Sequence, residues 1–89
     1  MSPYEHVPAR ALAELACLIG EHGQPRDSAA VALVKIMRHL DAWRSGAADE
    51  SGYSHLVWAA YRVLFLLDAD LLGRRAPTWS GAATEEHRP

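Results

Sequence analysis

Residues 55–72, HLVWAAYRVLFLLDADLL, are the stretch that decides the fold. Large apolar residues follow one another here without alternating with polar ones, which indicates a helix that is apolar on nearly every side. A helix of this kind must be covered on all of its faces. Ser54 is placed to cap its start, and Gly73 is placed to end it. We therefore predict a helix from His55 to about Leu72, against which the rest of the chain packs.

Two further helices are predicted upstream of this stretch. The first follows Pro8 and is ended by Gly20, Gly23 and Pro25. The second is capped by Asp27 or Ser28 and stops at Gly46. Each helix carries one apolar stripe at helical spacing. The stripes are Leu12, Leu15, Ala16 and Ile19 in the first helix, and Ala29, Leu33, Ile36, Leu40 and Trp43, widened by Val34 and Met37, in the second. No strand pattern is found, so the predicted fold class is all-α, with three main helices in a small bundle.

The length of 89 residues fits one small domain. We expect a single helical domain over residues 1–73 and a flexible C-terminal tail over residues 74–89, with Trp79 as its one anchor-like residue. Two helices with one stripe each can cover only about half of an all-round apolar helix. We therefore expect a homo-oligomer, a dimer or a tetramer, that completes the bundle through the third helix.

Charge and cysteine content limit the classes of partner. The formal net charge is -2, so no basic excess points to nucleic acid or to an anionic membrane surface. Cys17 is the only cysteine, which excludes an intrachain disulfide and a cysteine-rich zinc site. The longest apolar run, Leu56–Leu67, is interrupted by Arg62 and falls short of the about 20 residues that a membrane span needs. With no signal-peptide pattern in the first ten residues, we expect a cytoplasmic protein.

Two histidines flank an acidic turn, and they form the candidate site. His39 precedes the turn GAADESG (residues 46–52), His55 follows it, and Asp49 and Glu50 lie within it. A short turn between antiparallel helices brings the end of one helix to the start of the next, so we expect the two imidazoles to lie close together. Imidazole and carboxylate groups suit a divalent metal. The predicted metal ligands are His39, Asp49, Glu50 and His55, with Glu50 and His55 as the catalytic candidates.

Two basic residues extend this hypothesis toward phosphate. Lys35 and Arg62 would face phosphate oxygens, where fixed positive charge stabilises developing negative charge. The alternative is a solvated corner between two helices. In that case His55 only fills space, Asp49 and Glu50 favour the positive end of the helix dipole, and Arg62 runs along an apolar face to water. The residues alone leave both interpretations open.

Three segments, in one order, resemble a known family. They are VPARALAELACLIGEHG (7–23), MRHLDAWRSG (37–46) and DESGYSHLVWAAYRVLFLLDAD (49–70). Together they resemble the phage and bacterial family of dATP/dGTP diphosphohydrolase N-terminal domains. His39, Glu50 and His55 stand at matching positions, whereas Trp58 stands where the family has a further histidine. The resemblance implies an α-helical, oligomeric protein connected with nucleoside triphosphate hydrolysis, with Mg²⁺ or Mn²⁺ as cofactor.

Two hypotheses for function follow. The first is a metal-dependent enzyme or binder of nucleotides of the dATP/dGTP diphosphohydrolase type. The second is a non-enzymatic, phage-encoded module that binds a protein, such as an inhibitor of a host complex. The short chain and the replacement of a family histidine by Trp58 favour the second, whereas the retained His39, Glu50 and His55 favour the first.

Overall fold

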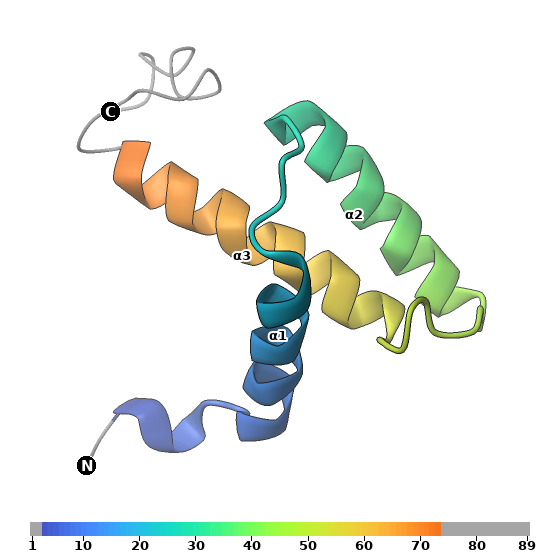
Figure 1. Ribbon diagram of the computed structural model, residues 1–89, viewed down its shortest axis with the longest axis horizontal. Coiled ribbons are helices and arrows are strands. Elements are labelled where there is room, and N and C mark those ends of the chain that lie inside the picture. The colour runs from blue at the N-terminus through green and yellow to red at the C-terminus, as the bar shows by residue number, and fades with distance from the viewer. Residues whose placement is uncertain (1–2, 74–89) are drawn as a thin grey trace.

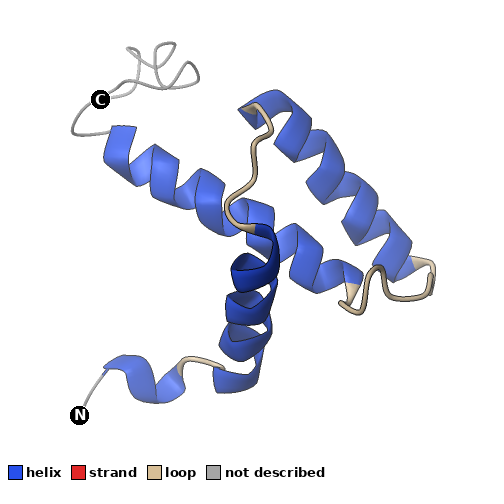
Figure 2. Cartoon of the chain, in the orientation of Figure 1, coloured by secondary structure: helices blue, strands red, loops and turns tan. Residues whose placement is uncertain are grey.

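The computed structural model describes residues 3–73, which form four helical elements. A short 3-10 helix, η1 (Pro3–His6), precedes α1 (Ala9–His22), α2 (Ala29–Arg44) and α3 (His55–Gly73) (Figure 1). Over these residues the only β pairing is an isolated bridge between Glu50 and Tyr53, and Figure 2 shows helices and loops without a strand. The predicted all-α class with three main helices is confirmed. The tail and Trp79 lie outside the described residues.

Local hydrogen bonds explain where α2 begins and ends. The Ser28 hydroxyl accepts a hydrogen bond from the Val31 amide, so Ser28 is the N-cap. At the other end Gly46 has a φ of 81°, a left-handed conformation that glycine adopts without a steric penalty. The amide of Ala47 then reaches back to the Ala42 carbonyl at 2.9 Å, as in a Schellman motif. The predicted stop at Gly46 is confirmed.

The ends of α1 and α3 follow similar rules. Ser54 caps α3, because its hydroxyl accepts a hydrogen bond from the Leu56 amide at 3.1 Å. The prediction that Gly20 helps to end the first helix is wrong, since α1 continues through it to His22. Gly23, with a φ of 71°, is the residue at which the helix stops.

The core lies where α1 and the turn before α3 meet the first half of α3. Both α1 and α2 pack against α3, and α1 crosses it rather than running alongside (Figure 1). The Tyr61 hydroxyl donates a hydrogen bond to the Gly23 carbonyl at 2.6 Å, which ties the α1–α2 loop to α3. The core consists of buried Leu18, Tyr53, Trp58 and Tyr61, with Leu15, Ile19, Val57 and Phe65 packed against them.

The predicted apolar stripe of α2 is confirmed at Ile36 but is wrong for its larger part. Ala32 and Ile36 are buried against α3, but Leu33, Leu40 and Trp43 are 53%, 45% and 55% exposed. The side of α3 that faces α2 carries the small residue Ala59 together with polar groups. The two helices therefore meet through Ile36 and through small and polar residues, and the other large apolar residues of α2 stay exposed.

The predicted stripe of α1 is wrong in part as well. Leu18, which the stripe did not include, is the most completely buried residue of the described chain. Leu15 and Ile19 pack against the core, whereas Leu12 and Ala16 are exposed. Because α1 crosses α3, the part of α1 from Leu15 onward packs against the core, and Leu12 before it stays exposed.

An apolar surface also remains on α3. Six residues of this helix are between 38% and 57% exposed, and they are Leu56, Val63, Leu64, Leu67, Leu71 and Leu72. The expectation that two short helices leave part of α3 uncovered is thus met within residues 3–73. None of the helices in this range combines the length and the apolar character that crossing a bilayer requires.

Candidate functional site

A tight turn positions Glu50 at the corner between α2 and α3. Glu50 and Tyr53 exchange two backbone hydrogen bonds of 2.9 and 3.0 Å around Ser51 and Gly52. Both central residues have positive φ angles, 52° and 86°, as the tightest hairpin turns require. The Trp58 indole nitrogen donates to the Glu50 carbonyl at 2.9 Å. The backbone of Glu50 is therefore held from both sides.

The two histidines meet at this corner, as predicted. His39 Nδ1 and His55 Nδ1 lie 2.8 Å apart. His55 Nε2 lies 2.8 Å from the Ala48 carbonyl oxygen. Because a carbonyl oxygen can only accept, Nε2 of His55 carries a proton and Nδ1 presents its lone pair in the neutral ring. His39 Nδ1–H then donates to it. A histidine held through its second nitrogen by a carbonyl is the usual arrangement of a metal ligand.

The surroundings of His39 favour its neutral form. Its ring stacks on the Trp58 indole, with centroids 6.0 Å apart and planes 13° apart. Burial lowers the pKa of His39 below its usual 6.5; the negative charge of Glu50 opposes this, and His55 adds to it. Metal ions bind the neutral imidazole, so these surroundings prepare His39 to act as a ligand near neutral pH.

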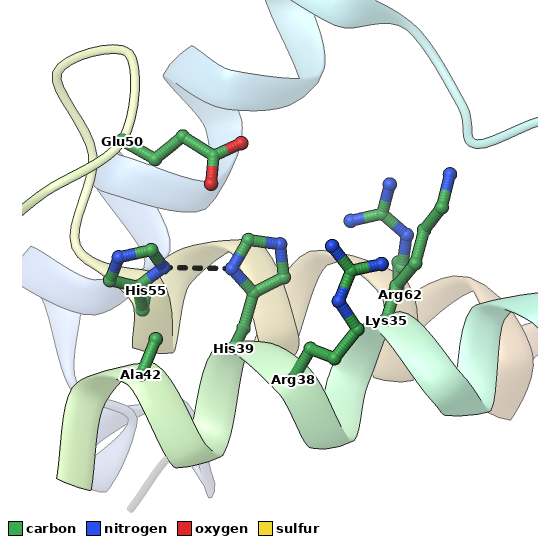
Figure 3. A pocket seen from close by; sticks show the side chains of 7 residues that line it. All are labelled: Lys35, Arg38, His39, Ala42, Glu50, His55 and Arg62. Carbon is green, nitrogen blue, oxygen red and sulfur yellow. Dashed lines mark hydrogen bonds between the residues drawn. The ribbon is translucent and has the colours of Figure 1, made fainter. Parts of the chain in front are cut away.

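Three side chains bring ligand atoms together. His39, Glu50 and His55 each offer one atom, and the three atoms lie within 4.8 Å of one another. Figure 3 shows the two imidazoles facing each other, with the Glu50 side chain extending over them from the turn. Two ligands of one ion are at most about 4.4 Å apart when each lies about 2.2 Å from it. The exposed Glu50 side chain can close the small remainder. Asp49, predicted as a further ligand, does not belong to this cluster.

The three-residue cluster lies at one end of a cleft of about 310 Å³ between α2 and α3. Basic residues gather beside the histidines in Figure 3. Arg38 was not singled out from the sequence, although its position three residues after Lys35 places both on one side of a helix. The residues that line this cleft are Lys35, Arg38, His39, Ala42, Glu50, His55 and Arg62.

Asp27 joins the two predicted phosphate-binding residues. One carboxylate oxygen lies 2.9 Å from Lys35 Nζ, and the other lies 2.8 Å from Arg62 Nε. The side chains of Asp27 and Arg62 are only 13% and 12% exposed. Hydrogen bonds from Lys35 and then Arg62 hold the pKa of Asp27 below its usual 3.8. Arg62 therefore does not run out to water, and Asp27 serves this contact rather than capping α2. No local pattern in the sequence indicates a contact between two residues 35 positions apart.

Comparison with known proteins agrees with the family resemblance. Residues 1–77 match the profile of a protein family described as dATP/dGTP diphosphohydrolase, N-terminal. Searches of curated proteins and of solved structures returned no match. The profile covers most of the 89 residues, including the helices, the acidic turn and both histidines. The chain belongs to the dATP/dGTP diphosphohydrolase N-terminal family.

Proposed function

We propose that this protein binds dATP or dGTP through a divalent cation and hydrolyses the triphosphate with release of diphosphate. One observation carries the proposal: a cluster of two imidazoles and one carboxylate shares a cleft with three basic side chains. A cation site beside fixed positive charge is what a polyphosphate requires. The family to which the chain belongs supplies the nucleotide class.

His39, Glu50 and His55 would hold the cation. Of the two candidate ions, Mg²⁺ prefers oxygen ligands, whereas Mn²⁺ accepts imidazole more readily. The two imidazole ligands, His39 and His55, therefore favour Mn²⁺. When bound, such an ion would neutralise phosphate charge and lower the pKa of a coordinated water.

Lys35, Arg38 and Arg62 would hold the phosphate oxygens. Asp27 keeps the Arg62 guanidinium in place and leaves Nη1 buried without an acceptor in the described part of the chain. A buried donor of this kind is rare, and an oxygen of a bound ligand would satisfy it. Arg38 is exposed at the edge of the cleft and is free of the constraint that Asp27 places on the other two.

The experiment is a hydrolysis and binding assay with purified protein. A panel of deoxynucleoside triphosphates is incubated with Mn²⁺ or Mg²⁺, and nucleotide products and diphosphate are measured. We expect turnover or metal-dependent binding of dATP or dGTP, and we expect both to be lost in Glu50→Ala. Absence of turnover and of binding with either ion would reject the proposal.

We also propose that a second copy of the chain covers the exposed residues Leu56, Val63, Leu64, Leu67 and Leu71 of α3. Uncovered apolar surface of this extent is unusual for a monomer in water. The same surface suits the second candidate function, a non-enzymatic module that binds another protein. Light scattering separates the two: a dimer or tetramer supports self-association, whereas a monomer of about 10 kDa leaves the surface for another protein.

A further inference from the structure

A second cleft adjoins the proposed phosphate site. It has a volume of about 330 Å³ and lies between the α1–α2 loop, the first turns of α2 and the second half of α3. Arg62 lines both clefts, and Asp27, which lines the second, is bonded to Lys35 and Arg62 of the first. The two clefts are therefore neighbours that meet at this ion-paired group.

The lining of the second cleft differs from that of the first. Most of its lining residues are apolar, and four are polar or charged: Gln24, which offers an amide, Asp68, which offers a carboxylate, and the paired Asp27 and Arg62. Apolar walls with a few polar groups are typical of sites for small organic ligands. The apolar residues include Pro25, Ala32, Phe65, Leu66 and Leu72.

The spacing between the clefts fits one ligand that occupies both. Ala32 lies seven residues before His39 on α2, and Ala69 lies seven residues after Arg62 on α3. Seven residues of α-helix correspond to about 10 Å. A ligand that reaches from the histidine cluster to the apolar cleft is thus long, charged at one end and apolar at the other. A nucleoside triphosphate has this shape and polarity.

We propose that the second cleft is the nucleoside subsite, which binds the base and the deoxyribose while the triphosphate lies along Arg62 and Lys35 toward the histidine cluster. The subsite rests on the proposed function, since it needs a polyphosphate in the first cleft. Flat base and sugar surfaces would pack on Phe65 and Leu66, and the amide of Gln24 would contact a polar edge of the base.

Filling the cleft tests this proposal. Ala69→Phe places a ring inside it, and Ala60→Phe is the matched control. Ala60 lies on the same helix and is half-buried like Ala69, but it lines a groove facing α1 instead. Each variant is titrated with a dATP analogue that has a methylene bridge between its α and β phosphates, and with inorganic tripolyphosphate, both with Mn²⁺. The methylene bridge prevents hydrolysis during the titration.

We expect Ala69→Phe to weaken binding of the nucleotide analogue by about tenfold or more and to leave tripolyphosphate within about twofold of wild type. Ala60→Phe should change neither affinity. Equal losses for both ligands in Ala69→Phe, or no loss for either, would overturn the subsite. If wild-type protein fails to bind tripolyphosphate, the proposed function itself falls and the subsite with it.

Should Ala69→Phe fail to fold, as judged by circular dichroism, Leu72→Gln provides a second variant. Leu72 is 57% exposed in the last turn of α3, so the fold does not depend on it. The substitution keeps the size of the side chain, adds no charge, and removes one apolar wall. We expect a loss of about threefold for the nucleotide analogue alone. Unchanged affinity for the analogue would count against the subsite.

Discussion

The two sides of α2 differ in character, and most of its large apolar residues lie on the side opposite to the one expected for a surface helix. The inner side, toward α3, consists of Ala32, Lys35, Ile36 and His39. The outer side carries Leu33, Val34, Met37, Leu40 and Trp43, all at least 45% exposed. In a self-sufficient domain the apolar side would face the core. The inner side instead carries Ile36 among small and ionisable residues, of which Ala32, Lys35 and His39 line clefts, and the other large apolar side chains are left exposed.

Assembly is where we expect the largest effect. Replacing Leu64 and Leu67 together by lysine should convert a dimer to a monomer, because each residue is about half exposed and would lose its burial in both copies. We expect a loss of about 3–6 kcal/mol per dimer. Light scattering at several protein concentrations measures this. The control is the replacement of Leu33 and Leu40, on the outer side of α2, by lysine. If only this control variant dissociates, the interface lies on α2 instead of α3.

Removing Asp27 should have the next largest effect, and it acts on stability. Asp27→Ala leaves Arg62 buried without its carboxylate, and breaking a buried ion pair costs about 3 kcal/mol. Urea unfolding followed by circular dichroism measures the loss. Asp41→Ala is the matched control, since Asp41 pairs with Arg44 on the surface and should contribute less than about 1 kcal/mol. Similar losses of unfolding free energy in the two variants would mean that the pair of Asp27 with Arg62 contributes no more to stability than the surface pair of Asp41 with Arg44.

The affinity for Mn²⁺ should distinguish the three ligand side chains from carboxylates nearby that are not ligands. Glu50→Ala and His55→Ala should each weaken Mn²⁺ binding at least about tenfold, or about 1.4 kcal/mol, because each removes one of three ligands. Calorimetry measures the affinity. Asp49→Ala removes the adjacent carboxylate of the same turn, and Asp68→Ala removes one from α3. Neither should change the affinity, and a loss in Asp49→Ala equal to that in Glu50→Ala would place the ion elsewhere in the turn.

The smallest effect concerns pH. The pKa of His39 is lowered from 6.5 in the folded protein, mainly by burial. As pH falls below 6.5 the unfolded chain therefore takes up the proton first, so the contribution of His39 to stability is complete above 6.5 and is lost as pH falls through the lower folded pKa. Unfolding free energies of wild type and His39→Gln across this range should show a shallower slope in the variant. Asp27 acts in the same direction but only below its usual pKa of 3.8.

Parts of the fold and the site could be predicted from sequence because they depend on neighbours along the chain. Ser28, Gly46 and Ser54 set helix ends through hydrogen bonds that span two to five residues. The meeting of His39 and His55 follows from the short turn between their helices. Spacing alone did not choose Glu50 over Asp49 as a ligand, although the family resemblance matched Glu50. The choice depends on the bridge to Tyr53 and on the indole of Trp58.

The sequence by itself determined three helices, most of their ends, the acidic corner with its two histidines, and the family. Tertiary structure alone decided which side of α2 faces α3, and it also decided that Asp27 would bind Lys35 and Arg62. The physical reason is that periodicity reports which residues share a side of a helix, but not what the neighbouring helix presents to that side. Here α3 presents an alanine, a histidine and an arginine, so the contact favours small and charged partners over the leucines that the pattern placed inside.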